Sequence, residues 1–326
     1  MKTRLLGKSG IRVSEVGLGC WQLGGDFGPM DDDRARHILK AAAENGINFW
    51  DTADVYGSGL SERRIAEFTK QSGANPVITT KVGRDAALYP DGYTKQKVRA
   101  SIEGSAGRLN VESVDLVQLH CVPPEILKAG DIFDWMEEFQ EQGLIKAFGA
   151  SVETIEEAKV AMNCPSLTSL QVIFNIFRQN AISELFPLAK ANNVGIIVRL
   201  PLASGVLSGK MTHDRKFAES DHRHYNRHGE AFSQGETFSG IPFETALGFV
   251  EEIKAWLPPG MTLAQMAMRW ILDQPTASTV IAGASRPEQV VENASASRLN
   301  SLPGALHKKL EDLYRREIEP AIRVPI

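Results

Sequence analysis

The stretch that decides the fold runs from Asn48 to Glu62 and reads Asn-Phe-Trp-Asp-Thr-Ala-Asp-Val-Tyr-Gly-Ser-Gly-Leu-Ser-Glu. Its apolar beginning predicts the end of a buried strand, its glycines predict a loop, and its last residues predict the start of a helix. The stretch is therefore one strand–loop–helix unit. Asp51 and Tyr56 are expected at the carboxyl end of the strand.

The same unit recurs along most of the chain. Short apolar runs rich in β-branched residues alternate with longer segments of helical periodicity, which is typical of βα units and a parallel sheet. Eight such units predict a closed (β/α)8 TIM barrel, with the whole chain 1–326 as a single domain. The eight predicted strands are Val16–Leu18, Asn48–Trp50, Val77–Thr80, Val114–Leu119, Ile145–Phe148, Leu170–Phe174, Gly195–Val198 and Thr279–Ala282.

Helix punctuation supports this division. Asp31–Asp33 can cap a helix that Gly46 ends, and Thr94 can cap a helix that buries Val98, Ile102 and Leu109. Two more helices are expected over residues 153–160 and 287–293. A doubly wound open sheet also alternates strand and helix, but no G-x-G-x-x-G turn follows the first strand, which favours the barrel.

Three segments lie outside the repeat. Residues 2–4 and 12–14 predict an N-terminal β-hairpin that plugs one barrel end. The polar segment from about 212 to 241 predicts a long functional or mobile loop. After Ser301, leucines at helical spacing predict an added C-terminal helix whose inner face carries Leu306, Leu310 and Leu313.

Composition limits the classes of function. A net charge of -4 gives no general attraction to nucleic acid or to anionic membranes, so a small-molecule ligand is expected. The 43% hydrophobic content is ordinary for a globular protein, and no apolar run has the length of a signal sequence or a membrane span. Cys20, Cys121 and Cys164 form no C-x-x-C pair, which favours a reducing compartment, and we expect the cytoplasm.

Four polar residues are expected on one rim of the barrel. Asp51 and Tyr56 follow one predicted strand, Lys81 follows the next strand along the chain, and His120 follows the strand after that. Reversible carbonyl reduction needs a proton donor to match an arriving hydride. Tyr56 can donate that proton, with Lys81 favouring its phenolate, Asp51 balancing Lys81, and neutral His120 orienting the carbonyl. Each residue alone could be structural: Asp51 and Lys81 as an ion pair, Tyr56 as an interface aromatic, and His120 as a core histidine. The presence of all four on one rim favours catalysis.

The sequence resembles the aldo-keto reductase family, whose pattern Asp-Thr-Ala-x-x-Tyr-Gly-x-Gly-x-Ser-Glu is matched from Asp51 to Glu62. Lys81 and His120 match the family's lysine and histidine after the third and fourth strands. The resemblance covers nearly the whole chain. It implies a plugged barrel, a metal-free mechanism, NADP(H) along the carboxyl-end rim, and a carbonyl or alcohol substrate. The family also resembles potassium-channel β-subunits, so a cofactor-binding regulatory subunit is the alternative.

The resemblance also implies a set of cofactor-binding residues. One loop resembles the family's pyrophosphate loop, and a second resembles its adenosine-end clamp, in which Arg286 is expected to meet a 2′-phosphate. Ser151 and Gln171 match positions that hold the nicotinamide carboxamide, with Asn175 as a lesser candidate. The loop residues are Pro201, Leu202, Ser204, Gly205, Leu207 and Lys210, then Gly283, Ser285, Arg286, Gln289 and Asn293.

The chain departs from the family pattern at two positions. Val152 stands where the family often has Asn, and Arg199 occupies the place of the residue that stacks on the nicotinamide ring, where Tyr is common. A guanidinium can stack on a ring, but it adds positive charge beside it. Trp21, after the first strand, is expected to wall the substrate pocket or to pack in the core.

The 212–241 segment also carries four histidines, His213, His222, His224 and His228. Their spacing raises a third hypothesis, a metal-dependent lyase or isomerase. The run from Asp221 to His228 carries two cations and no second ligand cluster is present, so we expect a solvated loop without metal. The physiological substrate, the direction of flux and the oligomeric state have no signal in the sequence.

Overall fold

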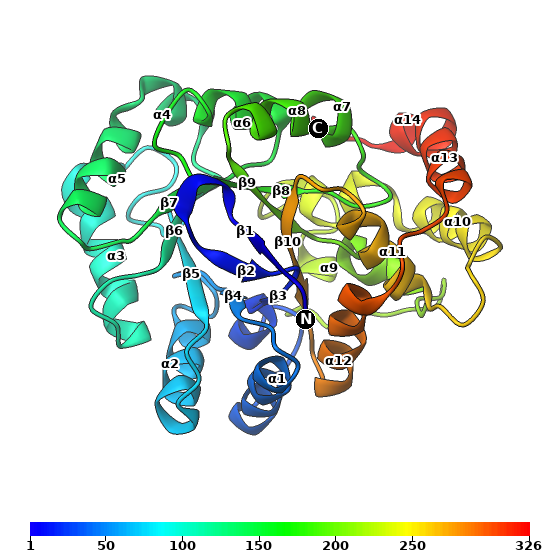
Figure 1. Ribbon diagram of the computed structural model, residues 1–326, viewed down its shortest axis with the longest axis horizontal. Coiled ribbons are helices and arrows are strands. Elements are labelled where there is room, and N and C mark those ends of the chain that lie inside the picture. Colours follow the sequence, from blue (N-terminus) through cyan, green and yellow to red (C-terminus); the bar gives the residue numbers. More distant parts are fainter.

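The computed structural model describes residues 1–326, and eight of its strands close into a parallel barrel (Figure 1). Around the barrel the strands follow chain order, with the last strand pairing with the first. The predicted (β/α)8 fold is therefore confirmed. The strands are β3 (Val16–Gly19), β4 (Phe49–Asp51), β5 (Val77–Val82), β6 (Leu116–His120), β7 (Phe148–Ser151), β8 (Ser169–Ile173), β9 (Gly195–Arg199) and β10 (Ala277–Gly283).

The helices surround the barrel and bury their apolar faces against it (Figure 1). Most connections hold one helix; β6 is followed by two helices, β8 by two short ones and β9 by three. The barrel and the helices share a core cluster of 81 buried residues. The helices are α1 (Asp32–Glu44), α2 (Leu60–Ser72), α3 (Lys95–Leu109), α4 (Pro124–Ala129), α5 (Asp131–Glu141), α6 (Ile155–Ala161), α7 (Ala181–Glu184), α8 (Phe186–Ala191), α10 (Phe243–Lys254), α11 (Leu263–Leu272) and α12 (Pro287–Ser295).

The predicted caps are present. The side chain of Asp31 accepts a hydrogen bond from the backbone N–H of Arg34 at the start of α1, and Thr94 does the same for Lys97 in α3. Each satisfies a backbone donor that the first helical turn would otherwise leave unpaired. At α6 the helix begins at Ile155, two residues later than expected, because Thr154 forms a capping box with Glu157.

One strand is displaced from its predicted position. Ile145–Phe148 was expected as a strand, but β7 runs from Phe148 to Ser151, and Ile145 makes only an isolated bridge with Val114. Val114 and Ile145 precede β6 and β7 in the chain, and the neighbouring Lys146 pairs with Asp115 at 2.8 Å. Apolar character alone could not separate this bridge from the strand that follows it.

The N-terminal hairpin closes one end of the barrel (Figure 1). Strands β1 (Thr3–Leu5) and β2 (Arg12–Ser14) pair antiparallel, and Leu6 and Val13 complete a small core with residues from the barrel interior. The turn fits closely, because a Cβ atom on Gly7 would lie 2.3 Å from the backbone nitrogen of Gly195. The predicted plug is confirmed, and only the opposite, carboxyl-end rim is left for a ligand.

Two segments extend the carboxyl-end rim and the outer layer. The segment 212–241 is mainly loop, as expected, but it also contains the one-turn helix α9 (His222–Tyr225). The predicted C-terminal helix is α13 (Gly304–Leu313), which buries Leu306, Leu310 and Leu313 and precedes the short α14 (Glu319–Ala321). No helix combines the length and the apolar character needed to cross a membrane.

Candidate active site

The four residues Asp51, Tyr56, Lys81 and His120, which we call the tetrad, come together at the carboxyl-end rim. Asp51 and His120 are the last residues of β4 and β6, and Lys81 lies in β5 between them. The Lys81 Nζ donates hydrogen bonds to Asp51 Oδ1 at 2.5 Å, to Thr52 O at 2.8 Å and to Tyr56 Oη at 3.2 Å. The ammonium thus uses all three of its donors within the site.

Two glutamines support Asp51 from the barrel interior. Gln171 Nε2 donates to Asp51 Oδ2 at 2.8 Å, and Gln118 Nε2 lies 3.3 Å from the same oxygen. Both glutamines are buried, so these hydrogen bonds fix the carboxylate against Lys81. Gln118 was missed in the sequence, because it lies inside an apolar strand where an isolated amide carries no motif.

Tyr56 is held in place by aromatic contacts and by a tight loop crossing. Its ring stacks on Trp21 with centroids 5.7 Å apart, and it meets the His120 ring edge-on at 6.1 Å. The adjacent Gly57 touches the loop after β3, since a Cβ on Gly57 would lie 2.4 Å from the carbonyl oxygen of Gly24. The phenol hydroxyl therefore has one position relative to Lys81 and His120.

Burial controls the protonation of the tetrad. Burial raises the pKa of the Tyr56 hydroxyl, Lys81 lowers it, and the pKa ends at about 12. Lys81 acts in the expected direction, but desolvation of the phenolate outweighs it. Burial lowers the pKa of Lys81, while Asp51 and Tyr56 raise it more, so the ammonium stays charged. Burial, then Lys81, Arg84 and Arg199, hold the pKa of His120 well below its usual range. Its ring is therefore neutral at pH 7.

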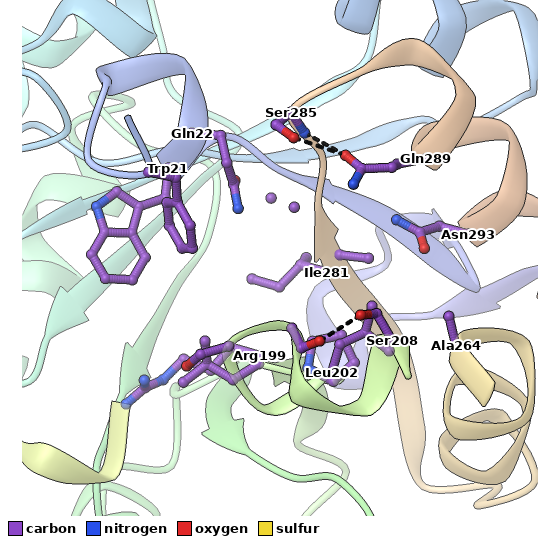
Figure 2. Close-up of a pocket in the computed structure, with 18 of the residues that line it drawn as sticks. Trp21, Gln22, Arg199, Leu202, Ser208, Ala264, Ile281, Ser285, Gln289 and Asn293 are labelled. Carbon is purple, nitrogen blue, oxygen red and sulfur yellow. Dashed lines mark hydrogen bonds between the residues drawn. The ribbon is translucent and has the colours of Figure 1, made fainter. Parts of the chain in front are cut away.

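A cavity of about 540 Å³ runs across this rim, which is an ordinary size for a cofactor or ligand site (Figure 2). Of the predicted site residues, only Lys81, Leu207 and the lesser candidate Asn175 do not line it. Lys81 lies beneath Tyr56 Oη, and Leu207 belongs to the core. Figure 2 shows Trp21 and Gln22 on one side of the cavity and Ser285, Gln289 and Asn293 on the other.

Several predicted cofactor residues already have protein partners. Gln289 Oε1 accepts from the Ser285 N–H at 2.8 Å and from its hydroxyl at 3.1 Å, which shapes the loop before α12 (Figure 2). Ser204 Oγ donates to Glu236 O at 2.9 Å. Asn175, the lesser candidate, does not line the cavity; its amide donates to Leu200 O and Ser239 Oγ.

The cavity also contains residues that the sequence did not single out. Arg215, Arg223 and Glu236 all come from the 212–241 segment, Glu236 from near its carboxyl end. Arg223 binds Asp221 through two hydrogen bonds and lies over the Phe27 ring at 5.3 Å. Arg223 is one of the two arginines in the run from His222 to His228, so its charge was visible in the sequence, but only the fold brings it and Arg215 to the cavity.

The histidines of this segment divide into two groups. His213, His224 and His228 are exposed, as the solvated-loop prediction expects. His222 contradicts it: its side chain is fully buried, with ring centroids 4.8 Å from Trp21 and 4.4 Å from Phe27. The backbone N–H of His222 donates to Asp26 O at 3.2 Å, which ties the segment to the loop after β3. His222 is buried because it serves as part of an aromatic cluster.

Comparisons with known proteins match nearly the whole chain. The model of the Aldo/keto reductase family matches residues 15–315. The aldo-keto reductase YhdN of Bacillus subtilis is 28% identical over 298 residues, covering 89% of this chain and 87% of that protein. A putative voltage-gated potassium channel subunit beta of Schizosaccharomyces pombe is 30% identical over 331 residues, covering 95% and 92%.

Solved structures give the same result. The holo form of the aldo-keto reductase AKR11C1 from Bacillus halodurans superposes with a TM-score of 0.78 at 26% identity, covering 96% of each chain. The glycerol dehydrogenase AKR11B4 from Gluconobacter oxydans gives a TM-score of 0.77 at 26% identity, covering 99% of this chain and 97% of that one. With the tetrad assembled on a barrel of this architecture, the chain belongs to the aldo/keto reductase family.

Proposed function

We propose that this protein is an NADP(H)-dependent oxidoreductase that reversibly reduces aldehydes or ketones to alcohols, with Tyr56 as the proton donor. One observation carries the proposal: Tyr56 Oη, a half-buried proton donor, lies 3.2 Å from a charged Lys81 and opens into the cavity that His120 also lines. No step needs a metal ion.

Each member of the tetrad has a defined task in this reaction. Tyr56, protonated at pH 7, donates to the carbonyl oxygen as a hydride reaches the carbonyl carbon, and takes the proton back in reverse. Lys81 stabilises the phenolate that remains, and Asp51 holds Lys81 in position through the 2.5 Å contact. His120, neutral because of burial and nearby cations, can donate a hydrogen bond to the same oxygen.

The residues around the cavity fit NADP(H), which supplies the hydride when bound. Lys210 pairs with Glu292 and Arg223 with Asp221, whereas Arg215 and Arg286 line the cavity without a carboxylate partner. Two unpaired guanidiniums suit phosphate groups, for which their planar donors are well matched. We assign Arg286 to the 2′-phosphate, the loop 201–210 to the pyrophosphate, and Ser151 with Gln171 to the nicotinamide carboxamide.

Replacing Tyr56 by Phe tests the proposal. The Tyr56→Phe variant should lose carbonyl reduction by roughly a thousandfold or more, because only the proton donor is removed. Its NADPH affinity, measured by fluorescence quenching, should stay within about twofold. The matched control is Tyr89→Phe, since Tyr89 is 48% exposed on the surface. Unchanged turnover in Tyr56→Phe, across a panel of aldehydes and ketones, would remove Tyr56 as the proton donor.

A second candidate function is a cofactor-binding regulatory subunit. Three relatives are named as probable or putative potassium-channel β-subunits, with identities of 27%, 28% and 30%. A steady-state assay separates the two functions: an enzyme turns over repeatedly, whereas a pure sensor oxidises at most one equivalent of bound NADPH. For either function we propose the cytoplasm, because none of the three cysteines is in a disulfide.

A further inference from the structure

The catalytic end of the cavity, which we define as the part lined by Tyr56, His120, Ser151, Arg199 and Glu236, also contains a buried ion pair. Arg199 Nη1 lies 3.3 Å from Glu236 Oε1, and the two side chains are 9% and 11% exposed. Arg199 ends β9, and Glu236 comes from the far end of the 212–241 segment. Figure 2 shows the Arg199 side chain reaching away from the Ser285 side of the cavity.

Both partners of this pair are fixed by the fold. Arg199 Nη2 donates to Val152 O at 3.2 Å. The backbone carbonyl of Glu236 accepts from Ser204 Oγ at 2.9 Å, and Ser204 Oγ accepts in turn from the backbone N–H of Phe238 at 3.1 Å. The two charges therefore cannot follow a ligand that binds beside them.

The charge of Glu236 decides the balance between positive and negative groups around Arg199. Arg84 pairs with Glu153 at 2.6 Å, and Arg178 donates to the Glu153 backbone oxygen at 2.6 Å. The carboxylates of Glu153 and Glu236 lie within 4.8 Å of each other. Three guanidiniums thus face two carboxylates. Removing the Glu236 charge would leave Arg199 without its only ion-pair partner.

The reaction itself changes the charge at this place. Hydride transfer moves two electrons and one proton from the reduced nicotinamide to the carbonyl carbon, and Tyr56 supplies the second proton to the oxygen. The nicotinamide ring is neutral before this step and carries one positive charge after it. Because the carbonyl oxygen must lie within hydrogen-bond distance of Tyr56 Oη, the reacting ring must occupy the catalytic end of the cavity.

We infer that Glu236 sets the relative affinity of this protein for oxidised and reduced cofactor by compensating the charge of Arg199 beside the nicotinamide ring. Arg199 alone would repel the positive oxidised ring and leave the neutral reduced ring almost unaffected. Glu236 offsets that repulsion, so the protein binds the product NADP⁺ with an affinity comparable to its affinity for NADPH. The inference rests on the proposed function, since it requires a nicotinamide cofactor.

The test compares dissociation constants for NADP⁺ and NADPH, measured by calorimetry or by protein fluorescence without substrate. In Glu236→Gln, the ratio of the NADP⁺ constant to the NADPH constant should rise roughly tenfold, because an uncompensated unit charge acts at close range in a partly dry site. A tenfold rise equals an increase of about 30 mV in the midpoint potential of the bound cofactor. Glu236→Asp, which keeps the charge, should stay near the wild-type ratio.

The matched control is Glu230→Gln, the same chemical change at an exposed carboxylate of the same segment, and its ratio should not move. Arg199→Gln makes the reverse prediction, a lower ratio at about pH 8, and keeps the inference testable if Glu236→Gln does not fold. Tight binding of both cofactors with an unchanged ratio in Glu236→Gln or Arg199→Gln would overturn the inference alone. Failure of the wild-type protein to bind either cofactor would overturn the proposed function with it.

Discussion

Gly24 and Gly57 lie in direct backbone contact across the loops that follow β3 and β4. A Cβ atom on Gly24 would lie 2.6 Å from the Gly57 nitrogen, and a Cβ on Gly57 would lie 2.4 Å from the Gly24 oxygen. Real Cβ atoms do not approach backbone so closely, so both positions exclude every other residue. The contact fixes the segment that carries Tyr56, and it explains in physical terms the glycine directly after the tyrosine in the sequence.

We predict that Gly57→Ala both destabilises the protein and impairs catalysis. Gly57 has φ of 57°, where a side chain adds strain, and the clash with Gly24 adds more. Together these should cost roughly 2–4 kcal/mol and reduce turnover by displacing Tyr56. Gly73→Ala is the matched control: it has φ of 70° but nothing within 4 Å of its Cβ, so it should cost only about 1 kcal/mol. Urea unfolding and steady-state rates distinguish the two, and equal losses would disprove the role of the contact.

Removing the charge of Asp51 alone should destabilise the protein more than removing the charges of Asp51 and Lys81 together. Lys81 is 1% exposed, so Asp51→Asn leaves a buried ammonium without its counter-ion and should cost about 3–5 kcal/mol. The double variant Asp51→Asn with Lys81→Met removes both charges and should lose much less than the sum of the two single variants. Denaturant unfolding of all four proteins gives the coupling energy. Strict additivity would show that the ion pair contributes nothing to stability.

The rate of carbonyl reduction should be level between about pH 6 and pH 9. Burial raises the pKa of Tyr56 to about 12 in spite of Lys81, so the proton donor stays protonated below that value. The pKa of His120 is held well below its usual range by burial and cations, so its ring is already neutral at pH 6. Alcohol oxidation, which needs the phenolate, should instead rise with pH throughout this range. A limb in the reduction profile that disappears in His120→Gln would contradict the neutral assignment of His120.

Arg286 should discriminate between the two nicotinamide cofactors. Arg286→Met should weaken NADPH binding by roughly tenfold or more and leave NADH binding unchanged, because only NADPH carries the 2′-phosphate. Fluorescence titration with both cofactors measures the effect. Arg63→Met, on the first turns of α2, is a control for the loss of one positive charge away from the cavity. An equal loss of NADPH and NADH affinity would place Arg286 on a group that both cofactors share.

His222 should make the protein sensitive to acid. Neither ring nitrogen has a hydrogen-bond partner, and burial lowers the pKa of His222 to about 4. The unfolded chain binds this proton near pH 6.5 and the folded protein does not, so stability falls as the pH drops from about 6.5 to about 4, by at most roughly 1.4 kcal/mol per unit. His222→Phe should remove that loss and be at least as stable at pH 7. Thermal unfolding across this pH range checks both statements, with His224→Phe as the exposed control; an unchanged slope in His222→Phe would contradict them.

The sequence was sufficient for the parts of the fold that depend on local periodicity. Alternating strands and helices, the caps at Asp31 and Thr94 and the hairpin before β3 all follow from patterns within a few residues. The sequence-based prediction was wrong at Ile145, which forms only an isolated bridge before β7. The apolar run continues from Ile145 into β7, and apolar character alone does not show where a strand begins to pair with the next strand of the barrel. The proposed tetrad was visible because each member lies at or near the end of a strand, where polar side chains interrupt an apolar run.

What only the tertiary structure decided is the environment of those residues. Glu236, Arg215 and His222 come from a segment without periodicity, and their positions depend on contacts with loops far away in the sequence. The net pKa of Tyr56 also depends on the fold, because burial by surrounding elements outweighs the one cation that the sequence could name. By itself the sequence determined which groups are present and on which strands; the tertiary structure decided their burial and partners, since desolvation and long-range charge pairing exist only once the barrel has closed.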